Sequence, residues 1–305
     1  VMKIKLTESQ FKRIILSEQY SKPITNLVIA QGDPKSKIEV GASKLAKSVG
    51  LVDIIVTPDM DTKDVVNEIE NLAKEGKIKN GGLDKVSIST HKTGCGKFDY
   101  EIIESSYLEY KGGQPDILDD DAESFWNVLS KYCSPSTQIF LGGCSVAKNP
   151  EVVYQIAKIV GCEVTAPTGI YNPFIGYTSK SENIGGSLGK YISCSPNDEQ
   201  SELPKYQQII KDTVLKRLGL DNELPKGSNE YLYKNIVTPL HLLLGDKLIT
   251  NDEHKRLKEL AVLTEDEHFE EMNKMVKEIA KRFLSKYVEV MGCKVVNKPS
   301  HHTFF

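Results

Sequence analysis

Two residues of this sequence have the chemistry of a nucleophile and its proton-transfer partner, and each follows a run typical of a buried strand. His91 follows residues 86–90, and Cys144 follows residues 139–141 and two glycines. A nearby imidazole lowers the pKa of a thiol and can protonate a leaving group. The backbone N–H groups of a glycine turn before a helix are suited to stabilising an oxyanion. The pair therefore predicts thiol-based nucleophilic catalysis.

The elements that must position this pair alternate between strand-like and helix-like segments over residues 24–168. Strands are expected at 25–30, 52–56, 85–90, 137–142 and 162–166, and helices at 38–49, 61–76, 120–133 and 149–160. Parallel strands joined by right-handed crossover helices satisfy this alternation. His91 and Cys144 would then follow consecutive strands at the carboxyl edge, where open α/β sheets bind ligands. We therefore expect a three-layer α/β sandwich with a mainly parallel sheet.

The residues around Cys144 carry a resemblance to a known family. Cys144 lies in a Gly-Cys-x-x-Ala context at 143–147, and a Gly-x-x-Val-x-Ala pattern follows at 161–166. Over about residues 24–180, these features resemble the caspase-like cysteine peptidases of clan CD, and they are most similar to bacterial caspase-like domains. The resemblance implies a caspase-like sheet and a His91/Cys144 dyad that hydrolyses peptide bonds.

The same resemblance implies an oxyanion site made of backbone N–H groups. Cys144 would supply one donor, and the turn of Lys92 and Gly94 would supply the other. The family usually has glycine directly after the histidine, whereas this chain has Lys92 there, with glycines at positions 94 and 96. Loops 92–118 and 167–190 would wall the cleft. The expected substrate contacts, all near predicted strand ends, are Gln31, Asp33, Cys95, Gly143 and Thr168.

An alternative interpretation needs no catalysis. A single cysteine or histidine is more often a structural residue than a catalytic one. The chain can therefore also be interpreted as a non-catalytic structural or interaction protein with a caspase-like fold, such as a bacteriophage virion component. Cys95, Cys144 and His91 lack customary metal-ligand spacing, so neither a metal nor a cofactor is expected.

The sequence divides into four expected parts. Residues 1–22 predict a strand and an amphipathic helix that form an appendage, and their lysine-rich opening is similar to that of many bacteriophage-encoded proteins. Residues 23–199 form the expected caspase-like domain. Residues 200–295 predict a helical cap or bundle with helices at 203–218, 228–244, 251–262 and 265–290, and residues 296–305 form a tail. The N-terminal helix and the C-terminal helices are the expected contact sites for protein partners.

Composition excludes several classes of function. The 305 residues carry a formal net charge of −3 with a pI near 6.1, which does not favour a nucleic-acid partner. No apolar run has the length of a membrane helix, and the first residues lack the apolar core of a secretory signal. We expect a cytoplasmic protein, located in the host cytoplasm or the virion if phage-encoded. None of the six cysteines forms a CxxC pair, so free thiols are expected.

Overall fold

The protein is described by a computed structural model that covers residues 23–31, 53–57, 59–89, 120–143, 146–148, 150–169, 171–172, 176–177, 191–196, 203–212, 228–263 and 266–297. The chain forms two compact units. The first extends to Gly142 and includes Ile159–Glu163, and the second consists of Gly143–Lys158 and the chain from Val164 to Thr303. The predicted appendage 1–22 and the tail after residue 297 lie outside the described residues.

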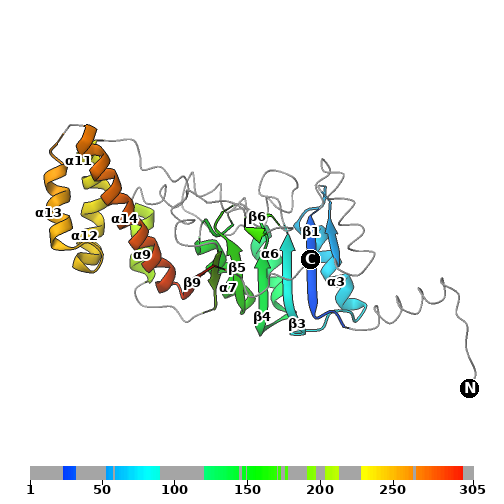
Figure 1. Ribbon diagram of the computed structural model, residues 1–305. Coiled ribbons are helices and arrows are strands. Elements are labelled where there is room, and N and C mark those ends of the chain that lie inside the picture. The colour runs from blue at the N-terminus through cyan, green and yellow to red at the C-terminus, as the bar shows by residue number, and fades with distance from the viewer. Residues whose placement is uncertain are drawn as a thin grey trace, which may run out of the picture. The chain divides into compact units, whose positions relative to one another are not determined.

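The first unit is a parallel sheet with helices. Its strands are β1 (Asn26–Gln31), β2 (Ile54–Val56), β3 (Leu83–Ser89) and β4 (Cys133–Leu141), and they lie in the order β2-β1-β3-β4 (Figure 1). All three neighbouring pairs are parallel. Helix α3 (Thr62–Lys74) lies between β2 and β3 in the chain, and α6 (Asp120–Ser130) precedes β4. The predicted mixed α/β class with parallel strands is confirmed.

Local sequence explains where α3 begins and ends. Asp61 accepts a hydrogen bond of 3.0 Å from the backbone N–H of Asp64, and the Asp64 carboxylate accepts one of 3.2 Å from the Asp61 N–H. This reciprocal capping satisfies donors that the first turn leaves unpaired. The helix ends before Gly76, whose φ of +72° suits glycine. The sequence therefore fixes both ends of the helix locally.

Both faces of the parallel strands are covered. Leu27 and Ile29 of β1 are fully buried, and the alternate residues Val28 and Ala30 are only 9% and 8% exposed. Helices α3 and α6 contact each other and bury an apolar set that includes Val65, Ile69, Phe125, Trp126 and Leu129. Burial on both faces is expected for a parallel sheet, because its crossover connections place chain on each side.

The second unit contains strands that pair antiparallel. Strand β8 (Tyr191–Cys194) pairs with β5 (Glu163–Pro167) on one side and with β9 (Cys293–Val296) on the other. Two short strands, β6 (Tyr171–Asn172) and β7 (Gly176–Tyr177), form a separate antiparallel pair. Neither β8 nor β9 was among the predicted strands. Residues 293–295 lie in the part expected to be helical, and residue 296 lies in the expected tail, so both assignments are wrong at these positions. Both strands have only four residues, which is too few to give a clear periodic signal.

A disulfide joins β8 to β9. Cys194 and Cys293 are directly opposite in the register, with an S–S distance of 1.97 Å and a Cα–Cα distance of 4.1 Å. The expectation of free thiols is wrong for this pair, whereas Cys133 and Cys162 are free. The two bridged residues are 99 positions apart, so only the strand pairing brings them together. Such bonds are characteristic of oxidising environments.

The other described elements of the second unit are helices. They are η2 (Val146–Lys148), α7 (Pro150–Val160), α9 (Leu203–Asp212), α11 (Asn229–Leu232), the π-helix η3 (Tyr233–Val237), α12 (Thr238–Leu244), η4 (Gly245–Lys247), α13 (Asn251–Leu260) and α14 (Asp266–Val290). Three of the predicted helical segments (228–244, 251–262 and 265–290) agree with this description within about two residues at each end. The predicted helix 203–218 is described as far as Asp212. The expected helical character of this region is therefore observed from 203 to 212 and from 229 to 290, apart from the short connections.

The long helix α14 carries the apolar stripe that the sequence indicates. Met272, Val276 and Phe283 are fully buried, and the Phe283 ring stacks on Tyr206 of α9 with centroids 5.4 Å apart. Phe269 and Met275, at the margin of the stripe, are half-buried. The stripe is thus a packing surface within the second unit, as its helical spacing predicts.

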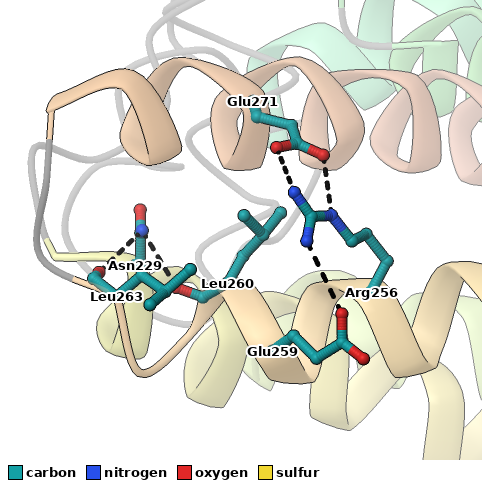
Figure 2. A network of polar contacts seen from close by, with 6 residues as sticks. All are labelled: Asn229, Arg256, Glu259, Leu260, Leu263 and Glu271. Atoms are coloured by element: carbon teal, nitrogen blue, oxygen red, sulfur yellow. Dashed lines mark hydrogen bonds and ion pairs between the residues drawn. The ribbon is translucent and has the colours of Figure 1, made fainter.

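Polar contacts fix α13 beside α14 and α11 (Figure 2). The Arg256 guanidinium donates two hydrogen bonds, of 2.8 and 2.6 Å, to the Glu271 carboxylate. Asn229 is buried, and its side-chain amide donates hydrogen bonds of 3.0 Å to the carbonyl oxygens of Leu260 and Leu263. These bonds connect the start of α11 to the last residue of α13 and to the turn that follows it.

None of the helices described above is both long enough and apolar enough to cross a bilayer.

Candidate functional site

The candidate site lies at the carboxyl ends of β3 and β4. These strands are parallel, with Val86 opposite Ile139 and Ile88 opposite Leu141. One residue further on, the Gly142 N–H donates a hydrogen bond of 2.7 Å to the Ile88 carbonyl oxygen. The two strands therefore end side by side, at the edge where parallel α/β sheets place chemistry.

Both predicted catalytic residues lie outside the described residues. The description of β3 stops at Ser89, two positions before His91, and that of the segment after β4 stops at Gly143, directly before Cys144. Lys92 and Gly94, the expected oxyanion residues, and the expected substrate contacts Asp33 and Cys95 also lie outside the described part. The structure thus describes the strand ends that precede the dyad.

Three expected substrate contacts are described. Gln31 ends β1, and its neighbour Ala30 is opposite Ser89 of β3, so β1 ends at the same edge of the parallel sheet. In the second unit, Gly143 is buried, and Thr168, which directly follows β5, is fully buried. Gln31 therefore shares an edge with the end of β3, and the other two residues are packed in the second unit.

A buried carboxylate lies in the first turn of α7, the helix that follows Cys144 in the chain. Glu151 is 5% exposed, and its Oε1 accepts a hydrogen bond of 2.8 Å from the side-chain amide of Gln207 in α9. The N-terminus of a helix favours negative charge, which helps this carboxylate to remain buried. Glu151 thus connects α7 to α9, and no local pattern predicts this contact, because Gln207 is 56 positions away in the chain.

Two imidazole rings and a phenol form a second cluster that sequence reasoning missed. His241 of α12 stacks on His254 of α13 with ring centroids 3.8 Å apart. The Tyr233 hydroxyl lies 3.0 Å from His254 Nε2. These contacts join η3 and α12 to α13. Their positions in three separate helical segments explain why no motif revealed them.

Two thiols of the first unit are free. Cys133, at the start of β4, is partly exposed, and Cys162, directly before β5, is buried. The pKa of the Cys162 thiol is raised, first by hydrogen bonding with the Cys133 side chain and then by burial and by negative charge at Cys133 and Glu163.

Metal binding finds no support in the described segments. Nowhere among them do three or more His, Cys, Asp or Glu side chains gather as ligands for an ion. A shallow surface depression of about 380 Å³ follows α6 and is lined by Asp120, Glu123, Ser124, Asn127, Val128 and Lys131. All of these residues come from α6 and the turn after it, so the depression is one face of a helix rather than an enclosed site.

Comparisons with known proteins identify no relative. No protein-family model, curated protein or solved structure matches this chain.

Proposed function

We propose that this chain is a cysteine endopeptidase of caspase-like type, with Cys144 as the nucleophile and His91 as the general acid and base. The observation that carries the proposal is the hydrogen bond from Gly142 N–H to the Ile88 carbonyl at the ends of two parallel strands. His91 is three positions after Ile88 in the chain, and Cys144 is two positions after Gly142. Two groups that leave a sheet from adjacent strand ends are well placed to act on one substrate atom.

The proposed reaction follows the chemistry of thiol proteases. The Cys144 thiolate attacks the carbonyl carbon of the scissile peptide bond, and backbone N–H groups of Cys144 and the Lys92–Gly94 turn stabilise the oxyanion. The His91 imidazolium then protonates the leaving amine, and a thioester to Cys144 forms. Water, deprotonated by His91, hydrolyses this thioester and releases the thiol and the carboxylate product.

Substrate contacts are proposed for the strand ends around the dyad. Gln31 ends β1 at the same edge as β3, and Asp33 follows it after one residue. Cys95, Gly143 and Thr168 complete the proposed set. Because carboxylate and amide groups bind peptide backbone or basic side chains, Gln31 and Asp33 would orient an extended peptide substrate.

A non-catalytic interaction or structural role is the second candidate, and a specific observation favours it. Gly143, which directly precedes the proposed nucleophile, is buried, and so is Thr168, which directly follows β5. Close packing at strand ends suits a scaffold that binds partners through other surfaces. In this interpretation the N-terminal and C-terminal helices bind protein partners, for instance in a phage particle.

Labelling with peptide electrophiles separates the two candidates. Native protein is treated with thiol-reactive peptides that differ at P1, beside Cys144→Ala, His91→Ala and the matched control Cys133→Ala, which removes a free, partly exposed thiol outside the proposed site. A catalytic dyad gives labelling at Cys144 that Cys133→Ala retains and His91→Ala loses by about a hundredfold or more. Labelling of Cys95 and Cys144 at equal rates, unaffected by His91→Ala, would support the scaffold role instead.

A further inference from the structure

The turn between α3 and β3 contains an asparagine that is followed directly by a glycine. Asn80 and Gly81 are both exposed, and they are the middle residues of a turn in which the Gly82 N–H donates a hydrogen bond of 2.9 Å to the Lys79 carbonyl oxygen. Gly81 has a φ of +63°, a conformation that favours glycine. No other asparagine of the sequence is followed by glycine. The Asn80–Gly81 linkage therefore lies at the surface in a turn that suits both residues.

Little stands in the way of a reaction between these two residues. A backbone nitrogen can attack the side-chain amide carbon of the asparagine before it, and the side chain of the attacking residue usually hinders this approach. Gly81 has no side chain. A Cβ atom at position 81 would have only the Cys133 carbonyl oxygen, at 3.8 Å, within 4 Å among the described residues beyond its chain neighbours. The space beside the Gly81 nitrogen is therefore open to water.

One hydrogen bond restrains the attacking nitrogen. The Gly81 N–H donates a hydrogen bond of 3.1 Å to the Lys131 carbonyl oxygen, after the end of α6. The nitrogen must lose this proton before it can attack, so the reaction waits until the bond opens. Bonds of an exposed turn open locally, without unfolding of the whole chain. The fold therefore slows the reaction of Asn80 relative to an unfolded chain, and it does not prevent the reaction.

We propose that Asn80 is a site of spontaneous deamidation and isoaspartate formation. The Gly81 nitrogen bonds to Cγ of Asn80, the bond from Cγ to Nδ2 breaks, and the amide leaves as ammonia with the proton that the Gly81 nitrogen loses. Water then adds to one carbonyl of the resulting succinimide ring. Attack at Cγ gives aspartate, and attack at the main-chain carbonyl gives isoaspartate. One water is consumed and one ammonia is released, with no oxidation or reduction.

Isoaspartate at this position changes a turn that is fixed at both ends. Its main chain passes through the former side chain and is one carbon atom longer. Ile78 and Leu83, on either side of the turn, are only 3% and 1% exposed, and the Leu83 N–H donates a hydrogen bond of 3.1 Å to the Tyr132 carbonyl oxygen. The longer turn must therefore disturb packed neighbours, which weakens the first unit. This inference is independent of the proposed peptidase activity.

Peptide mapping of the full chain tests the site. Folded protein is incubated near neutral pH and digested with trypsin beside a sample that was not incubated, and the peptides 80–85 and 64–74 are compared by mass spectrometry. The second peptide contains Asn67 and Asn71, which are exposed on α3 and are not followed by glycine. We expect Asn80 to exchange its amino group for a hydroxyl about tenfold or more faster than these two, because glycine leaves the attack unhindered. Conversion of Asn80 no faster than that of Asn67, or only in urea, would overturn the proposal.

Two variants test the mechanism and its effect on the turn. Asn80→Gln has a longer side chain that closes a ring much more slowly, so its 80–85 peptide should keep its mass. Asn80→Asp has the charge of the product with an ordinary main chain, and it should unfold at nearly the same urea concentration as fresh native protein. Incubated native protein, followed by Trp126 fluorescence, should unfold at a lower concentration. Equal unfolding of incubated protein and Asn80→Asp would overturn the proposed effect of isoaspartate, whereas the mapping of native protein decides the site even if a variant fails to fold.

Discussion

The backbone N–H of Gly142 donates a hydrogen bond of 2.7 Å to the carbonyl oxygen of Ile88, one residue beyond the last pair of β3 and β4. This bond keeps the two parallel strands together up to the point where the chain continues toward His91 and Cys144. In the proposed peptidase, it determines how far apart the two segments leave the sheet.

Removing this donor should weaken both stability and reactivity. Gly142→Pro leaves the Ile88 carbonyl without its partner, and an unpaired buried group costs about 1–3 kcal/mol. Urea unfolding measures the loss, and the single tryptophan, Trp126, reports it by fluorescence because its ring is buried in the first unit. Gly142→Ala, which retains the N–H, should label at Cys144 faster than Gly142→Pro. Equal labelling of both variants would show that the bond does not position the dyad.

The Cys194–Cys293 disulfide should contribute strongly to stability. The bond closes a loop of 99 residues, and disulfides in such loops typically contribute about 2–5 kcal/mol. We expect the double variant Cys194→Ala and Cys293→Ala to unfold at lower urea than native protein without reductant. Reductant should lower the urea concentration at which half of the native protein is unfolded, and it should leave that concentration unchanged for the double variant. Native midpoints that are identical with and without reductant would contradict the stabilising role.

The buried side chain of Asn229 should contribute to the stability of the helical region. Asn229→Ala removes two hydrogen bonds to the carbonyl oxygens at the end of α13, at a cost of about 1–3 kcal/mol. Helical circular dichroism during urea unfolding measures this loss. The control Glu230→Ala alters the exposed neighbour and should change the midpoint much less. An equal effect of both substitutions would indicate that the capping bonds add nothing.

Glu253 should make stability depend on pH. Burial opposes ionisation of this carboxyl, but hydrogen bonds from Arg282 and Thr250 and the Arg282 charge outweigh it, so its pKa lies below the ordinary value of 4.5. A lowered folded pKa means that the stabilisation is present above the unfolded pKa and is lost as pH falls through the folded one. We expect an effect below about 1 kcal/mol, because the pair is partly exposed.

The matched variant for this test is Glu253→Gln, because glutamine can preserve the capping box with Thr250. Native protein should be more stable than Glu253→Gln near neutral pH, and the difference should shrink as the medium is acidified below the ordinary glutamate pKa. A difference that stays constant over this range would mean that the Arg282 contact does not depend on the Glu253 charge. Thermal melts across the pH series provide the measurement.

Much of the fold could be predicted from local patterns. Apolar periodicity indicated α3 and α14, and Gly76 indicated where α3 stops. Helix-like segments were also expected at the positions of α7 and α13, and alternation with helices indicated β1 to β5 as successive strands. These signals act within a few residues of one another, and a short stretch of chain therefore reveals them. The position of His91 and Cys144 shortly after two strand ends belongs to the same class of local information.

Other features depend on contacts between residues that are far apart in the chain. The sequence by itself determined the helices, the parallel strands, and the presence of an imidazole after β3 and a thiol after β4. Only the tertiary structure decided that β8 and β9 pair and bring Cys194 to Cys293, and that His241 stacks on His254. The physical reason is that pairing and burial depend on which distant segments share a surface, and no local pattern encodes that choice.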